Sequence, residues 1–264
     1  PPPPPPPPPP PFFLPPADGT RDAQESRGLG DVYKRQQREG QLERDVDRLV
    51  RNDRIAWGAS MIACKDADAM VTGNIRHYAA SIEKLKKVTE PRPGEEIFGM
   101  TMITLGGKTI LVADTNVQDF PSPERLVKVS KSCVRVARLF GFDPKVAFLS
   151  HSTFGKPISK NTKHVRDAIE LLKNEKVDFD FDGEMQPDVA LNPIYKDIYP
   201  FSKIVGNANI LIMPALHSAA ISTKLMKVFG GGKLIGPLLI GLGSPIAVSY
   251  THLRAHETPE HLGR

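Results

Sequence analysis

Apolar residues recur along the chain with two different spacings, and their order predicts an α/β protein. In the first half they return every three or four positions, which is typical of amphipathic helices near 42–50, 53–64, 78–88 and 123–140. Between the last two helices, the segment 96–115 has two apolar stretches on either side of Gly106 and Gly107. Because glycine adopts the positive φ of a tight turn, this segment is expected to form a β-hairpin.

From residue 144 onward, apolar strands and amphipathic helices alternate regularly. Continuous apolar stretches predict strands at 145–150, 177–181, 208–214 and 234–242. The segments between them favour helices, one near 165–172 and one that runs through 225–229. Strands that are apolar throughout and separated by helices indicate a parallel sheet that is covered on both faces.

The two ends of the chain differ in composition from its middle. Residues 1–11 are all proline, and the stretches 29–36 and 249–264 resemble translated sequencing-adapter read-through. We therefore expect 1–36 to be a non-native or disordered tail and 249–264 to be a non-native tail. The alternative for the N-terminal end is a proline-rich segment that binds a partner.

Composition and charge exclude several classes of protein. The formal net charge of +5 comes without a clustered basic stripe, so no nucleic-acid partner is expected, although a phosphorylated ligand such as coenzyme A would suit it. No apolar run approaches the ~20 residues that span a bilayer, so no membrane partner is expected either. Cys64 and Cys133 lack CxxC spacing, which argues against a disulfide framework or a zinc site and fits a reducing, cytoplasmic location.

A polar loop after the strand at 145–150 holds the first candidate binding residues. Hydroxyls, an imidazole and a glycine before a helix can present donors to an anion. The candidates are Ser150, His151, Ser152, Thr153 and Gly155. The alternative is a capping loop whose serines satisfy their own backbone.

Two further loops follow strand ends. Asp182 and Glu184 could take a proton or hold a cation, or they could simply form a turn in which Asp182 makes an Asx turn. Pro214, His217 and Ser218 mark a strand-to-helix junction, where a single histidine is more often structural than catalytic. No spacing in the chain matches a metal site or a nucleotide fingerprint, so no metal is predicted.

In their order along the chain, six segments resemble the phosphate acetyl/butyryltransferase family. They are 66–73, 110–126, 145–155, 181–191, 206–219 and 236–246. His151, the DGEM sequence at 182–185 and the segment 92–100 are most similar to the branch found as the C-terminal domain of bacterial NADP-dependent malic enzymes.

The resemblance implies a two-domain fold like that of isocitrate and isopropylmalate dehydrogenases, with parallel sheets and an interdomain cleft, truncated at its C-terminus. One α/β subdomain would comprise 37–143 plus 235–248, and the other 144–234. Family members move an acyl group between coenzyme A and phosphate without a covalent nucleophile or a metal. By the same resemblance, the candidate residues of the first two loops would bind acyl-CoA or acyl phosphate.

Two departures from the family bear on activity. The Ser-Arg-Gly loop of active members would follow Val248, where the native-looking sequence stops, so no catalytic residue is assigned. Glu83 stands where active members carry an arginine and would repel phosphate, although Lys84, Lys86 and Lys87 could compensate.

These departures favour an acyl-CoA-binding regulatory and oligomerisation module of an NADP-dependent malic enzyme, with acetyl-CoA or coenzyme A as a non-covalent ligand. The alternative is a catalytic phosphate acyltransferase. A third reading is purely structural, with the sheet serving only as a dimer surface. Self-association is expected. We also expect the truncated chain to fold poorly and to expose its closing strand at 234–242 as an edge.

Overall fold

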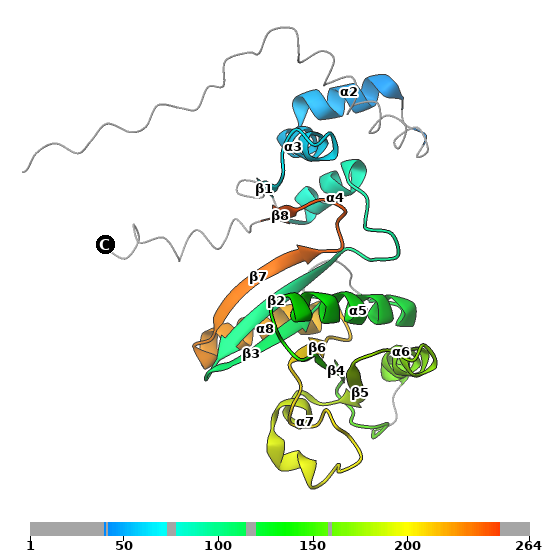
Figure 1. Cartoon of the computed structure of the whole chain (residues 1–264), viewed down its shortest axis with the longest axis vertical. Helices are drawn as coiled ribbons and strands as arrows, with labels where there is room; N and C mark the ends of the chain where they lie inside the picture. The colour runs from blue at the N-terminus through cyan, green and yellow to red at the C-terminus, as the bar shows by residue number, and fades with distance from the viewer. Residues whose placement is uncertain (1–39, 41, 73–77, 115–119, 158–159, 249–264) are drawn as a thin grey trace, which may run out of the picture.

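The computed structural model describes residues 40, 42–72, 78–114, 120–157 and 160–248. Two units follow one another along the long axis of the molecule (Figure 1). A small helical unit lies at one end and a larger α/β unit, built on a six-stranded sheet, occupies the rest.

Among the described residues, three helices and a two-stranded sheet form the small unit. Its elements are α2 (Glu43–Asn52), α3 (Arg54–Ala63), β1 (Met70–Thr72), α4 (Tyr78–Val88) and β8 (Ile246–Val248). Asp53 begins α3, since its carboxylate accepts the N–H of Ile55 at 2.9 Å, and it also pairs with Lys84 of α4 at 2.8 Å. β1 and β8 run parallel, so the chain returns to this unit after it has completed the larger one.

The larger unit contains β2 (Phe98–Leu105), β3 (Lys108–Ala113), β4 (Lys145–Leu149), β5 (Asp180–Met185), β6 (Ile210–Ile212) and β7 (Lys233–Ile240). The strands lie in the order β5-β4-β6-β3-β2-β7. β5, β4, β6 and β3 are mutually parallel, whereas β2 is antiparallel to both of its neighbours. The sheet is therefore mixed.

The mixed sheet corrects the expectation of parallel sheets. The hairpin at Gly106 and Gly107, whose φ angles are 57° and 77°, is confirmed, and it reverses β2 relative to β3. β7 then returns antiparallel beside β2 and forms one edge of the sheet. The expected subdomain boundary between 143 and 144 stays a prediction.

Helices cover both faces of the sheet (Figure 1). α5 (Pro123–Leu139) and α6 (Lys163–Asn174) lie on one face, and α7 (Pro187–Leu191) and α8 (Leu216–Gly230) on the other. Short 3₁₀ turns, η1 (Lys160–Thr162) and η2 (Pro193–Lys196), precede α6 and follow α7. Successive residues of one strand serve opposite layers: in β4, Val146 and Phe148 pack under α5 and α6, while Ala147 and Leu149 pack toward α7 and α8.

Candidate functional site

The carboxyl ends of β4 and β6 lie side by side in the centre of the larger unit. The two strands are parallel neighbours, with Val146 opposite Ile210 and Phe148 opposite Ile212. Polar residues follow both strands, beginning at Ser150 after β4 and after Pro214 beyond β6. In open α/β sheets, ligands bind at such strand ends.

A cavity of about 720 Å³ opens at this place, and we call it the strand-end pocket. Its size lies within the range of small-molecule sites. The lining comes from the start of α5, the end of β4, η1 with the first turn of α6, and the β6–α8 junction. The lining residues are Phe120, Pro123, Ser150, His151, Lys160, Asn161, Thr162, Lys163, His164, Asp167, Pro214, Ala215, His217 and Ser218.

Three helices begin at the rim of the strand-end pocket. The Ser122 hydroxyl caps α5, because it accepts the N–H of Arg125 at 3.3 Å. At the starts of α6 and α8, by contrast, the side chains of Thr162 and Ala215 make no capping hydrogen bond. The first-turn N–H groups of α6 and α8 and the positive ends of their dipoles therefore favour an anion here.

The charged side chains of the strand-end pocket leave it positive. Lys163 pairs with Asp167 at 2.6 Å, one turn along α6. Within the described residues, Lys160 forms no ion pair. The two lysines outnumber the single carboxylate of the lining, and the walls at Phe120 and Pro214 are apolar. This combination suits an anionic ligand that also carries an apolar part.

Two histidines of the strand-end pocket are held by their surroundings. The Nε2 atom of His164 lies 3.0 Å from the Pro214 carbonyl oxygen. Since a carbonyl only accepts, this contact assigns the proton to Nε2. The ring of His217 packs against that of Phe120, with centroids 5.6 Å apart. Both contacts tie the start of a helix to another part of the rim.

The loop after β4 divides its candidate residues between the pocket and the fold. Ser150 and His151 line the strand-end pocket. Ser152 is buried and donates its hydroxyl proton to Glu184 at 2.6 Å. The hydroxyl of Thr153 accepts the N–H of Gln186 at 3.2 Å, so these two residues hold the loop against the end of β5.

The remaining candidates also take structural positions. Gly155 has a φ of 84° and sits in the tight turn between Thr153 and Lys156, where a left-handed backbone favours glycine. A carboxylate oxygen of Asp182 accepts the N–H of Gly183 at 2.9 Å. Neither Gly155 nor Asp182 lines the strand-end pocket.

Glu184 forms the centre of a buried polar cluster behind the strand-end pocket. Its side chain is only 1% exposed and accepts hydrogen bonds from Arg166 at 3.0 Å and from Ser152. Arg166 also donates to the Thr162 hydroxyl at 2.7 Å. Glu184 thus joins β5, the loop after β4 and the start of α6, which fixes two walls of the pocket.

Glu83 lies outside the lining of the strand-end pocket. It lies on α4 in the small unit, where its exposed side chain is 3.5 Å from Lys87. Lys84 is engaged with Asp53 in the same unit. Neither Glu83 nor the neighbouring lysines line the strand-end pocket, and repulsion of phosphate by Glu83 stays a prediction.

Sequence reasoning passed over the cationic part of the site. Lys160, Lys163 and His164 come just before or within the first turn of α6, ten or more residues after β4 ends. The signal available in the sequence was a run of polar and basic residues immediately before a helix start. The sequence places His217 and Ser218 at a strand-to-helix junction, and the structure brings them to the same pocket as Ser150 and His151.

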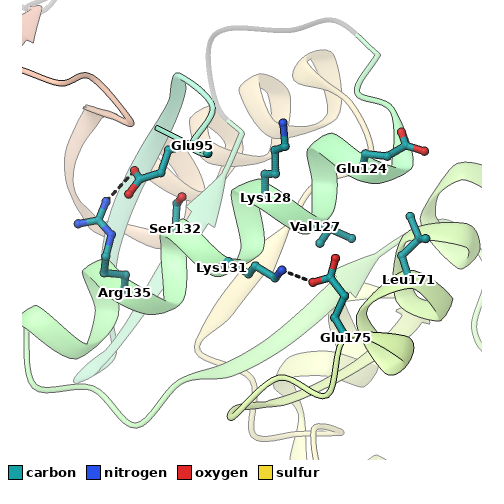
Figure 2. A pocket seen from close by; sticks show the side chains of 10 residues that line it. Glu95, Glu124, Val127, Lys128, Lys131, Ser132, Arg135, Leu171 and Glu175 are labelled. Atoms are coloured by element: carbon teal, nitrogen blue, oxygen red, sulfur yellow. Dashed lines mark hydrogen bonds and ion pairs between the residues drawn. The ribbon is translucent and has the colours of Figure 1, made fainter. Parts of the chain in front are cut away.

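A second hollow, of about 440 Å³, lies between α5 and α6, and we call it the α5–α6 pocket. Figure 2 shows its charged side chains, with Lys128, Lys131 and Arg135 projecting from successive turns of α5. Arg135 pairs with Glu95 at 2.8 Å, and Lys131 pairs with Glu175. Lys128 pairs with Glu96 at 3.1 Å. Each of the three cations therefore has a carboxylate partner.

Charges in the α5–α6 pocket balance. The lining has three cations and three carboxylates, namely Lys128, Lys131, Arg135, Glu95, Glu124 and Glu175. Hydrogen bonds from its own backbone N–H and from the Ser122 hydroxyl lower the pKa of Glu124 and so favour its ionised form. An anion that entered this pocket would have to displace existing ion pairs.

In the described part of the chain we also looked for a reactive thiol, a metal site and a membrane-spanning helix. Burial raises the pKa of the Cys133 thiol, which disfavours the reactive thiolate. Among the described residues, no group of three His, Cys, Asp or Glu side chains could hold a metal ion. In the same residues, no helix combines the length and the apolar character needed to cross a membrane.

Comparison with known proteins adds a family and a fold. The family described as Phosphate acetyl/butaryl transferase matches residues 17–251. This span begins inside the segment 1–36, which was expected to be a non-native or disordered tail. The chain is 44% identical to an NADP-dependent malic enzyme from Rhizobium meliloti over 218 residues, which cover 83% of this chain and 29% of that enzyme. The chain therefore spans less than a third of that relative.

Two solved structures share the fold. A phosphotransacetylase from Streptococcus pyogenes superimposes with a TM-score of 0.79 at 28% identity, over 88% of this chain and 70% of that one. The EutD phosphotransacetylase from Staphylococcus aureus gives 0.76 at 25% identity, over 90% and 72%. The fold is thus that of phosphotransacetylases, an α/β fold with a mixed sheet, and the expected isocitrate/isopropylmalate dehydrogenase-like class was wrong.

Proposed function

Since the chain belongs to the phosphate acetyl/butaryl transferase family, we propose that it binds acyl-CoA in the strand-end pocket as a regulatory and oligomerising module of a cytoplasmic NADP-dependent malic enzyme. The observation that carries the proposal is the convergence of helix starts and lysines on one cavity. The uncapped starts of α6 and α8 and the side chains of Lys160 and Lys163 all meet there.

The geometry matches the chemistry of acyl-CoA and acyl phosphate. Both compounds carry phosphate groups, which backbone N–H groups at a helix start and lysine side chains bind well. The apolar wall at Phe120, Pro214 and Ala215 offers a place for the acyl chain. The ligand would be held without a covalent bond; Ser152, whose hydroxyl donates to Glu184, would not serve as a nucleophile.

The link to a malic enzyme rests on sequence similarity. The chain is 44% identical to its malic-enzyme relative and 25–28% identical to the two phosphotransacetylases. A regulatory module affects a distant site only if its ligand binds one of two conformations of the protein more tightly than the other. Acyl-CoA bound here would change the activity of a malic enzyme in this way.

Calorimetric titration of the 264-residue chain with acetyl-CoA tests the binding role. We expect saturable binding that acetyl phosphate weakens by competition. Coenzyme A and dephospho-coenzyme A, which differ by one phosphate, are the matched control pair, and the dephospho compound should bind less tightly. A titration that gives no heat and no increase in melting temperature would contradict the proposal.

A second candidate is a catalytic phosphate acyltransferase, favoured by the close superposition on the Streptococcus pyogenes phosphotransacetylase. In that reaction the thiolate of coenzyme A attacks the acyl carbon of acyl phosphate, and the bond from carbon to the phosphate oxygen breaks. Basic groups at the strand-end pocket would stabilise the departing phosphate. The test is loss of free thiol when coenzyme A and acetyl phosphate are mixed with the protein; an unchanged thiol concentration excludes this candidate.

A further inference from the structure

The two lysines of the strand-end pocket differ in their surroundings. Lys163 is the first residue of α6, and its ammonium group lies 2.6 Å from the carboxylate of Asp167. Lys160 begins η1, is exposed to solvent and has no carboxylate of the described chain within ion-pair distance. An amine attacks a carbonyl group only after it has lost a proton, and a carboxylate beside it favours the ammonium form. Of the two side chains, Lys160 is therefore the better nucleophile.

Lys160 also lies where one kind of activated acyl group would be held. The N–H groups at the start of α6 and the lysines beside them favour a phosphate group. In an acyl phosphate, the acyl carbon is bonded to an oxygen of that phosphate, so a lysine that binds the phosphate is also next to the reactive carbon. In acyl-CoA, the pantetheine chain separates the thioester from the phosphates. The pocket therefore brings Lys160 close to the acyl carbon of acyl phosphate.

We propose that Lys160 is a site of self-acylation by acyl phosphate bound in the strand-end pocket. This inference rests on the binding role proposed above and adds a covalent modification to the same site. It is separate from reversible binding, because the acyl group stays on the lysine after the phosphate has left.

The reaction is a simple acyl transfer to an amine. The ammonium group of Lys160 first gives one proton to water, which leaves a lone pair on Nζ. This lone pair attacks the acyl carbon and forms a C–N bond, while the bond from carbon to the phosphate oxygen breaks and its electrons go to the phosphate. The nitrogen then passes a second proton to the departing phosphate. The products are an acylated lysine and inorganic phosphate, and no further reactant is consumed.

Acylation would change the charge of the strand-end pocket, because it turns an ammonium group into a neutral amide. One lysine, Lys163, would then face one carboxylate, Asp167, which is the kind of balance found in the α5–α6 pocket. The acylated chain is expected to bind anions more weakly. Acyl phosphate would in this way lower the affinity of the pocket for coenzyme A compounds.

Peptide mass spectrometry of the 264-residue chain mixed with acetyl phosphate measures acetylation at each lysine, at about pH 8, where more of each amine is free. We expect Lys160 to react at least about tenfold faster than Lys163, because the bound donor is held beside a free amine. The rate at Lys160 should level off as acetyl phosphate is raised, which marks reaction from a bound complex. Acetyl-CoA at the same concentration should acetylate Lys160 more slowly.

Lys108 is the matched control lysine. It is exposed at the start of β3, lies outside the lining of the strand-end pocket and forms no ion pair with a described residue. Its rate should rise in proportion to acetyl phosphate and so measures the reactivity of an ordinary surface lysine. Asp167→Asn removes the partner of Lys163, whose rate should then rise at least about threefold while that of Lys108 stays the same. An unchanged rate at Lys163 would overturn the ion pair as the cause of selection.

Lys160→Arg keeps the positive charge and has no amine to acylate. Treatment with acetyl phosphate should lower the coenzyme A affinity of the wild-type chain about fivefold and leave that of Lys160→Arg at its untreated value. Coenzyme A that binds to a chain in which Lys160 reacts no faster than Lys108 would overturn the modification and leave the binding role in place. Saturable acetylation of Lys160 in a chain that binds no coenzyme A would support the modification and overturn the regulatory role.

Discussion

The strand-end pocket and the α5–α6 pocket contain similar side chains and differ in what those side chains face. Each has lysines on its wall, and each lies beside α5. In the α5–α6 pocket every cation of the lining is paired with a carboxylate. In the strand-end pocket the lysines outnumber the carboxylates, and uncapped helix starts add backbone donors. The comparison indicates that lysines favour an anion-binding site where carboxylates do not balance their charge.

The largest expected difference between the two pockets is in the free energy of unfolding that their ion pairs contribute. Arg166→Ala leaves the carboxylate of Glu184 buried without its cation, which costs roughly 3 kcal/mol in free energy of unfolding. Lys131→Ala removes a half-exposed pair with Glu175, worth less than about 1 kcal/mol. Urea denaturation of both variants measures the difference. Equal losses would mean that the buried cluster does not brace the strand-end pocket.

Charge reversal should separate the two pockets in ligand binding. Lys160→Glu and Lys163→Glu each place a negative charge beside the bound anion, and we expect acetyl-CoA affinity to fall about tenfold or more. Lys128→Glu, in the α5–α6 pocket, should leave affinity within twofold of wild type. The measurement is calorimetric titration. A larger effect at Lys128 than at Lys160 would reverse the assignment.

A smaller effect should come from the backbone at the start of α8. Leu216 is the first residue of this helix, and Ala215 before it is extended, with φ −163° and ψ 157°, so proline fits at 216. Leu216→Pro removes one N–H from the rim, and affinity should fall about fivefold, or about 1 kcal/mol. Leu216→Ala keeps the N–H and is the control. Equal affinities for the two variants would show that this donor does not reach the ligand.

The smallest effect concerns Glu124 at the edge of the α5–α6 pocket. Its pKa in the folded chain is lowered below the ordinary value of 4.5, so ionisation stabilises the fold above that value. This contribution is lost as pH falls through the folded pKa. Glu124→Gln should therefore be slightly less stable than wild type near neutral pH, and the difference should disappear in acid. Thermal melts between neutral pH and about pH 3 measure it, and a difference that grows in acid would contradict the assignment.

Much of the fold followed from hydrophobic spacing. The helix expected at 123–140 is observed at Pro123–Leu139, and the strand expected at 145–150 is β4 at Lys145–Leu149. The strand expected at 177–181 was misplaced, because β5 spans Asp180–Met185. Val177 and Phe179 are apolar since they pack against the core ahead of the strand, while β5 itself carries acidic residues and gains its place by pairing with β4.

Part of the site could not follow from the sequence because it depends on strand order. The loops after β4 and β6 share a pocket because these strands are neighbours, while β5 lies on the other side of β4. Glu184 at the end of β5 therefore braces the pocket from behind. Lys160 reaches the rim through the path of the chain before α6, which no local pattern specifies.

Hydrogen exchange with and without acetyl-CoA compares the two pockets in a single experiment. We predict slower exchange for the backbone amides of 150–151, 162–166 and 215–219, which surround the strand-end pocket, and unchanged exchange for 127–135 on α5. Protection of 127–135 with no change at the starts of α6 and α8 would contradict the central claim that the anion binds at the ends of β4 and β6.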